Sequence, residues 1–201
     1  MRILVVGATG TIGAAVALAL DARHEVVRAS HSRSAIRVDL ADVESIKRLY
    51  ATVGRVDAVV SAAGRAAFRP LATLTDADYQ LGLSNKLMGQ INLVRVGLDQ
   101  VADAGSFTLS SGILSRQPMP GGAAISMVNA ALEGFVRAAA LEMPRGIRIN
   151  AVSPGWVRET LASMKMDPTP GVPAVTVAQT YVRVVEGTMT GQTLDIVAGR
   201  A

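Results

Sequence analysis

The chain of 201 residues contains no cysteine, and only 3% of its residues are aromatic. The first absence excludes disulfide bonds and thiol catalysis and is compatible with a reducing compartment, so we expect a cytoplasmic protein. Because aromatic side chains are so few, the core has to be built from Ala, Val, Leu and Ile. Such small aliphatic residues suit a parallel β-sheet with close-packed helices on both faces.

Long apolar runs and runs of one charge are also missing. No uninterrupted apolar segment is long enough to cross a bilayer, so the sequence predicts no membrane partner. Arg2 and the apolar stretch after it superficially resemble a secretion signal, but three glycines interrupt that stretch and favour a strand, a turn and a helix. The net charge of +4 favours anionic small ligands over nucleic acid. His24 and His31 form no cluster with carboxylates, so no metal site is expected.

Length and patterning predict the fold. A hydrophobic fraction of 50% allows one sizeable core, so residues 1–201 are expected to form a single domain. Apolar runs predict strands at Ile3–Val6, Glu25–Arg28, Ile36–Val38, Val56–Val60, Ser106–Leu109, Arg148–Val152 and Thr193–Val197. Helical periodicity predicts helices at Thr11–Ala22, Val43–Ala51, Asp76–Ala102, Ala123–Glu142 and Val175–Val185. The alternation predicts a Rossmann-type, doubly wound parallel sheet of about seven strands with helices on both faces.

Two segments depart from this regular alternation. The connection Ala29–Ala35 is shorter than a parallel crossover usually needs, so the strand at Ile36–Val38 should be rudimentary. Met164–Ala174 contains three prolines and is predicted to be irregular, as a flap over a pocket would be.

A glycine-rich turn follows the first predicted strand. It carries Gly7, Thr9, Gly10, Thr11, Ile12 and Gly13 and leads directly into a helix. Glycines at such a turn let the backbone approach a pyrophosphate, which unpaired N–H groups at the helix N-terminus then bind. The turn therefore predicts a dinucleotide ligand. The alternative is a strand–helix turn that binds nothing, because a glycine triplet alone is a weak signal.

Further motifs, in order along the chain, extend this interpretation. They are the strand end Ser61-Ala62-Ala63-Gly64, Asn85, the pair Ser110-Ser111, the segment Ile149–Val157 and Thr190-Gly191-Gln192. In these motifs the sequence resembles the short-chain dehydrogenase/reductase family. The resemblance implies a small-molecule substrate and catalytic roles for Ser111 and Asn85. It also implies cofactor contacts from Ala62, Ala63, Gly64, Pro154, Gly155 and Val157.

The resemblance further implies a homodimer or homotetramer. We expect it to form through the helices at Asp76–Ala102 and Ala123–Glu142. In the first of these, Met88, Leu93 and Val96 make a second apolar side, whereas the stripe used for the core is a different one.

The end of the second strand indicates which dinucleotide binds. Folds that select NAD usually place a carboxylate there, and an arginine nearby accommodates the 2′-phosphate of NADP. This chain has Ser30-His31-Ser32-Arg33, with hydroxyls and a guanidinium that can bind phosphate. We therefore predict NADP rather than NAD, with Ser30 and Arg33 as ligands. Asp39 and Leu40 resemble the Asp-Val pair that contacts adenine in the family.

The proton relay of the family is missing. Its Tyr and Lys, four residues apart on one helix, align with Ile125 and Asn129, which can neither donate a proton nor supply a cation. Lys86 is the candidate substitute cation and Ser111 an alternative donor, although a helical lysine is more often a solvated surface group. The sequence thus predicts an atypical short member of the family: an NADP-dependent oxidoreductase of a small carbonyl or alcohol with a non-standard proton relay. The alternatives are a catalytically disabled NADP-binding sensor and a structural assembly subunit.

Overall fold

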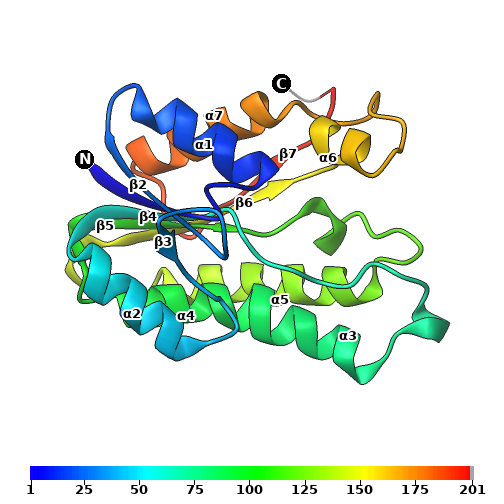
Figure 1. The fold of residues 1–201 in the computed structure, drawn as a ribbon, viewed down its shortest axis with the longest axis horizontal. Coiled ribbons are helices and arrows are strands. Elements are labelled where there is room, and N and C mark those ends of the chain that lie inside the picture. Colours follow the sequence, from blue (N-terminus) through cyan, green and yellow to red (C-terminus); the bar gives the residue numbers. More distant parts are fainter. Residues whose placement is uncertain (200–201) are drawn as a thin grey trace.

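A computed structural model describes residues 1–199 and contains one seven-stranded sheet (Figure 1). All neighbouring strands are parallel, in the order β3-β2-β1-β4-β5-β6-β7. The strands are β1 (Arg2–Val6), β2 (Glu25–Ser30), β3 (Ile36–Arg37), β4 (Val56–Ser61), β5 (Val101–Ser110), β6 (Arg148–Pro154) and β7 (Thr193–Ile196). The predicted doubly wound parallel sheet is confirmed.

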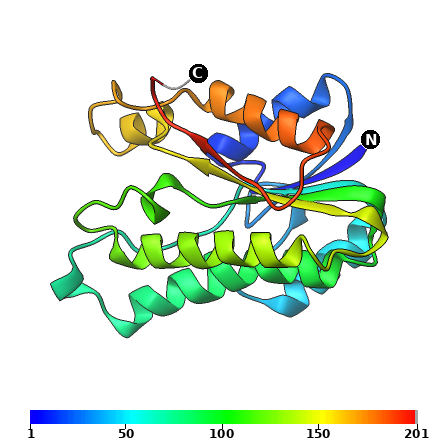
Figure 2. The ribbon, with the colours of Figure 1, turned by 180° about the vertical axis from the view of Figure 1, so that it is seen from behind.

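Helices cover both faces of the sheet. They are α1 (Thr11–Asp21), α2 (Val43–Val53), α3 (Asp76–Leu81), α4 (Met88–Gly97), α5 (Ala123–Ala139), α6 (Arg158–Ser163) and α7 (Ala174–Glu186). Figures 1 and 2 show α1 and α7 on one face and α2, α4 and α5 on the other. Each face has its own aliphatic core, as the low aromatic content predicted. Among residues 1–199, no helix is both long and apolar enough to cross a membrane.

The third strand is rudimentary, as expected. β3 consists of Ile36 and Arg37, which pair with Ala29 and Ser30 at the end of β2. No helix lies in the short connection between these strands. The chain therefore pairs with the edge of the sheet over two residues only before it continues to α2.

The long helix predicted at Asp76–Ala102 is wrong in two respects. A wide π-type turn at Gly82–Leu87 separates α3 from α4, and the helix ends at Gly97. Val101 fits the apolar stripe of the helix, but it is buried at the start of β5, which begins five residues before the predicted Ser106. A buried strand and a helix stripe both call for apolar residues, so periodicity could not separate them here.

The other predicted elements agree with the structure to within a few residues, and one helix was missed. The helix predicted at Ala123–Glu142 ends at Ala139, and α6 was not foreseen. α6 is only one and a half turns long, so it is too short for a periodic signal. The predicted flap largely follows it: Met164–Pro173 has no regular element, and Val172 forms an isolated parallel bridge with Val157.

Close packing between Gly7 and Gly13 determines the path of the glycine-rich turn. Gly7 has φ +85°, and a Cβ atom there would lie 2.6 Å from the carbonyl oxygen of Ala62. A Cβ at Gly13 would lie 2.1 Å from the carbonyl oxygen of Gly7. Only glycine at these two positions lets α1 approach the end of β1 this closely.

The outer side of α4 differs from the prediction. Met88, Leu93 and Val96 were expected to form an apolar side that faces a partner. Leu93 is fully buried and Val96 packs against the same core, so only Met88 presents an exposed side chain. The exposed side of α5 is apolar instead, except for Arg137. Its apolar members are Ala123, Met127, Ala130, Ala131 and Ala138.

The contact between Gly13 and Gly7 predicts an asymmetric response to alanine. We expect Gly13→Ala to lower the free energy of unfolding by about 2–3 kcal/mol, because backbone must shift to relieve the overlap. Gly10→Ala should cost less than about 1 kcal/mol, because its Cβ would have only one neighbour, at 3.4 Å. Urea unfolding of both variants checks this, and equal losses would contradict it.

The exposed side of α5 predicts where the chain self-associates. We expect a homo-oligomer at micromolar concentration, and we expect Ala131→Glu to shift it to monomer by placing a charge in an apolar contact. Light scattering after size-exclusion chromatography is the measurement. Leu18→Glu, at an exposed apolar residue of α1 on the opposite face, is the matched control. A monomeric wild-type chain would refute the prediction.

Candidate active site

The site forms where the segments after β4, β5 and β6 leave the sheet on the same side, at the right of Figure 1. Two cavities lie there, of about 440 and 380 Å³. They share Ala63 and Gly64, so they meet at the strand end that was predicted to contact a cofactor. Two adjoining cavities suit a ligand with two parts, such as a dinucleotide.

The smaller cavity contains some of the predicted cofactor-binding residues. Gly7, Ser30, Asp39 and Leu40 line it, together with His31 from the turn after β2. Ser30 Oγ also accepts the N–H groups of Arg33 and Ser34, at 3.0 and 2.9 Å, and so holds the turn after β2. Its hydroxyl proton stays available for a ligand.

The glycine-rich turn lies beside this cavity. Thr9, Gly10 and Thr11 form the entry to α1, and Ile12 reaches the larger cavity. Arg33, which is exposed, crosses back to the turn, where its Nη2 donates to the Thr9 carbonyl oxygen at 2.8 Å. The guanidinium predicted to bind a 2′-phosphate is thus tethered to the loop predicted to bind the pyrophosphate.

The structure separates Asn85 from Ser111. Asn85 lines the smaller cavity, where its Oδ1 accepts the backbone N–H of Arg65 at 2.8 Å. Ser111 and Lys86 line the larger cavity. Arg65 also lines the smaller cavity, a position the sequence did not indicate, because a single arginine in a loop carries no pattern.

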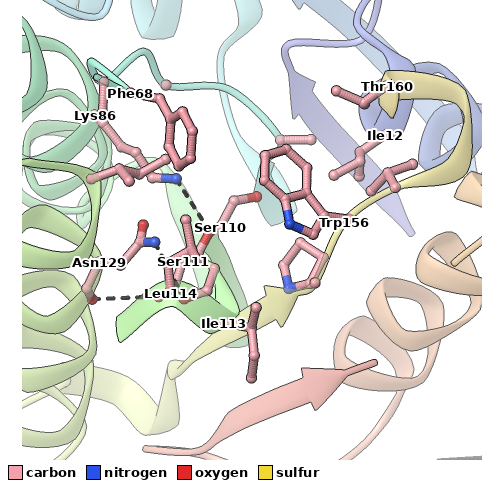
Figure 3. A pocket seen from close by; sticks show the side chains of 18 of the residues that line it. Ile12, Phe68, Lys86, Ser110, Ser111, Ile113, Leu114, Asn129, Trp156 and Thr160 are labelled. Carbon is pink, nitrogen blue, oxygen red and sulfur yellow. Dashed lines mark hydrogen bonds between the residues drawn. The ribbon is translucent and has the colours of Figure 1, made fainter. Parts of the chain in front are cut away.

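The larger cavity is mainly apolar, and Pro154, Gly155 and Val157, the residues predicted to contact a cofactor, lie in its lining. Phe68, from the segment after β4, and Trp156, from the segment after β6, meet edge to face, with ring centroids 5.8 Å apart (Figure 3). Ile113, Leu114 and Met164 complete this wall. None of these residues was predicted, because apolar loop residues look alike in a sequence whether they cover a ligand or face solvent.

Lys86 extends into the larger cavity from the wide turn before α4. Its Nζ donates to the carbonyl oxygen of Ser111 at 3.2 Å, and its stem packs on Gly64 (Figure 3). Burial lowers the pKa of Lys86 to about 8. An amine with that pKa can gain and lose a proton near neutral pH.

Ser110 belongs to a hydrogen-bond chain on the inner side of the cavity. Its Oγ donates to the Ser61 carbonyl oxygen at 2.5 Å and pairs with the Tyr181 hydroxyl at 2.5 Å. Tyr181 is fully buried, and burial raises its pKa to about 12 although the bond to Ser110 opposes the shift. Tyr181 therefore stays protonated and packs in the core.

Ser111 is bonded to a buried carboxylate that the sequence did not reveal. Its Oγ donates to Glu133 Oε1 at 2.5 Å, and Ser115 Oγ donates to the same oxygen at 2.7 Å. Arg116 forms ion pairs with Glu133 and with Asp195. Burial opposes the charge of Arg116, but its bonds to Asp195 and Glu133 outweigh this effect and raise the pKa of the guanidinium.

Ile125 and Asn129 both line the larger cavity, on one side of α5. Asn129 Nδ2 donates to the Gly112 carbonyl oxygen at 3.2 Å, whereas no group among residues 1–199 bonds to its buried Oδ1. Farther along the chain, Thr160 also lines the larger cavity. The preceding residue, Glu159, accepts the backbone N–H of Ala174 instead.

Comparisons with known proteins agree with this architecture. The model of the family described as enoyl-(acyl carrier protein) reductase matches residues 7–191. Hydroxynaphthalene reductase arp2 of Aspergillus fumigatus is 30% identical over 182 residues, covering 79% of this chain and 67% of that protein. The oxidoreductase UcpA of Salmonella typhimurium is 27% identical, and the chain spans only 53% of its length.

Solved structures extend the likeness to nearly the whole chain. The protein lin1944 from Listeria innocua is 43% identical with a TM-score of 0.94, over 98% of this chain and 99% of that one. A small-chain dehydrogenase in complex with NADPH is 26% identical with a TM-score of 0.87, over 99% and 97% of the two chains. With the glycine-rich turn, the parallel sheet and the paired cavities, these matches show that the chain belongs to the short-chain dehydrogenase/reductase family.

Proposed function

We propose that the chain is an NADPH-dependent reductase of small, largely apolar carbonyl compounds, in which Lys86 replaces the tyrosine of the family as proton donor. One observation carries the proposal: the Lys86 amine lies in the larger cavity, 3.2 Å from the Ser111 carbonyl oxygen. Ile125 and Asn129, which align with the Tyr and Lys of the family, line the same cavity but cannot protonate a substrate.

The residues present fit a nicotinamide dinucleotide. Gly7 lines the smaller cavity, which also offers Ser30 and Asp39 to an adenosine. Ala62, Ala63, Gly64 and Thr160 line the larger cavity, where the nicotinamide would lie. The NADPH complex of the small-chain dehydrogenase supports the choice of cofactor, as does the absence of a carboxylate from Ser30–Arg33.

The shape and lining of the larger cavity support an apolar, planar substrate. Phe68 and Trp156 can cover a flat ring, and Ile113 and Leu114 add an aliphatic wall. The name of the Aspergillus fumigatus relative, a hydroxynaphthalene reductase, is consistent with an aromatic compound of this size.

The proposed mechanism uses the Lys86 ammonium as general acid. When bound, the cofactor supplies a hydride to the carbonyl carbon. Lys86 donates a proton to the carbonyl oxygen, and the resulting neutral amine regains a proton from solvent. The Ser111 carbonyl oxygen orients the amine, and Ile125 and Leu114 keep that part of the cavity apolar, which helps to keep the amine poised near neutral pH.

A disabled NADP-binding sensor is the second candidate, and the substitution of Ile125 and Asn129 for a catalytic pair favours it. The two candidates differ in turnover. NADPH oxidation over a panel of aryl and alkyl ketones supports the reductase, whereas tight NADPH binding with no oxidation supports the sensor.

The turn after β2 predicts a preference between the two cofactors. We expect the Kd for NADPH to lie at least tenfold below that for NADH, because Ser30 and Arg33 can bind the 2′-phosphate. Arg33→Ala should weaken NADPH about tenfold and leave NADH unchanged. Calorimetric titration measures both, with Arg23→Ala, just beyond the C-terminal end of α1, as the control. Equal affinities in the wild type would refute the prediction.

The Lys86 amine predicts the pH dependence of the reaction. Reduction needs the protonated form, which predominates below the pKa of about 8, so kcat/KM should fall tenfold per pH unit above it. Lys86→Met should lower kcat/KM by about 10²–10⁴ at pH 7 and flatten the profile. Lys47→Met, which removes an exposed amine on α2, should change neither.

The melting temperature of Lys86→Met distinguishes a loss of catalysis from a loss of folding. The pKa of Lys86 in the folded state lies below its ordinary value of 10.5, so unfolding binds a proton between about pH 8 and 10.5. The contribution of Lys86 to stability therefore rises with pH across that window, and below pH 8 the buried charge costs stability. Lys86→Met should melt at or above the wild-type temperature at pH 7. A fall in activity together with a fall in melting temperature would point to misfolding instead.

A further inference from the structure

The hydroxyl protons of both serines at the larger cavity are already committed to the protein. Ser110 donates to the Ser61 carbonyl oxygen at 2.5 Å, so the Tyr181 hydroxyl must donate to Ser110. Ser111 points its proton at Glu133 Oε1, 2.5 Å away, with the Asn129 carbonyl oxygen as a weaker acceptor at 3.4 Å. Because a serine hydroxyl has a single proton, neither serine can donate to a ligand while these bonds persist.

Glu133 accepts each hydrogen bond that its side chain makes within residues 1–199. Only 4% of its surface is exposed, yet it receives Ser111, Ser115 and the Arg116 guanidinium. A charge-assisted bond to a carboxylate is stronger than a bond to a neutral carbonyl, so a substrate ketone cannot compete for the Ser111 proton. Ser111 therefore presents only lone pairs to the cavity.

Asn129 adds a second acceptor beside Ser111. Its amide nitrogen must face the Gly112 carbonyl oxygen, 3.2 Å away, because two carbonyl oxygens would repel each other. This fixes Oδ1 on the other side of the amide, where no group among residues 1–199 bonds to it, although the residue is only 1% exposed. An unpaired buried acceptor is costly, and a ligand that donates a hydrogen bond would relieve that cost.

We infer that the substrate carries a hydroxyl group beside the carbonyl that is reduced. The hydroxyl donates to Ser111 Oγ and Asn129 Oδ1, while the carbonyl oxygen accepts from the Lys86 amine, and Figure 3 shows these three side chains converging on one part of the cavity. Glu133 acts as a positioning residue that makes Ser111 an acceptor. The identity of the carbonyl rests on the proposed function, but selection of the hydroxyl does not require turnover.

Binding can be measured without turnover, because Trp156 is the only tryptophan of the chain and lines the cavity. We would titrate the protein, saturated with NADP⁺, with pairs of aryl ketones that differ by one hydroxyl group, and follow Trp156 fluorescence. The hydroxylated member should bind at least tenfold more tightly, and with NADPH its kcat/KM should be at least a hundredfold higher.

Two variants test the acceptor pair. The binding ratio is the Kd of the plain ketone divided by the Kd of its hydroxylated counterpart. Asn129→Leu removes the unpaired oxygen at similar volume and should reduce this ratio at least tenfold. Glu133→Leu frees the Ser111 proton, so Ser111 can donate to a plain ketone and the ratio should also fall. Asn92→Leu, on the outer part of α4, should leave the ratio unchanged. Should Glu133→Leu fail to fold, Asn129→Leu alone decides the matter.

The outcomes separate this inference from the proposed function. Selective binding of the hydroxylated member without NADPH oxidation supports the acceptor pair and refutes the reductase. Oxidation of NADPH with equal binding of both members, or a ratio unchanged in Asn129→Leu, overturns the acceptor pair and leaves the reductase standing. If no member of any pair changes Trp156 fluorescence, the inference is also overturned.

Discussion

The contact between α1 and the end of β1 is the constraint on which the carboxyl edge of the sheet depends. Because a Cβ at Gly13 would overlap the Gly7 carbonyl oxygen, the helix can begin against the sheet only with both residues as glycine. The same approach places Gly7 against Ala62, at the end of the neighbouring strand β4. Ala63 and Gly64 then follow as the shared boundary of the two cavities, so one backbone contact positions the centre of the whole site.

Beyond this contact, the hydrogen-bond donors and acceptors of the site lie on different residues. Tyr181 and Ser110 form an internal chain that ends on the Ser61 carbonyl oxygen, and Ser111 is turned toward Glu133. The Lys86 amine is left to offer protons at the cavity.

Most of the fold could be predicted from the sequence, and so could the place where several proposed nucleotide-binding residues gather, because both depend on local patterns. A buried strand followed by glycines and a helix can be recognised from adjacent residues, and Gly7, Ser30, Asp39 and Leu40 do gather at one cavity. The substrate side depends on contacts between distant segments, and no local pattern shows that Glu133 faces Ser111 or that Phe68 meets Trp156. The end of the long predicted helix was misplaced for a related reason, because the apolar spacing continues from α4 into β5.

The π-type turn that interrupts the predicted long helix has its own consequence for the site. A π-type turn contains one residue more than an α-helical turn, and each residue rotates a helix by about 100°. The turn at Gly82–Leu87 thus sets the rotation of α3 relative to α4. Within it, the successive residues Asn85 and Lys86 line different cavities. Loss of a single residue there would rotate α3 against α4 by about 100° and turn Asn85 or Lys86 away from the cavity that it lines. The lining of both cavities therefore depends on the length of one turn as much as on the identity of the residues within it.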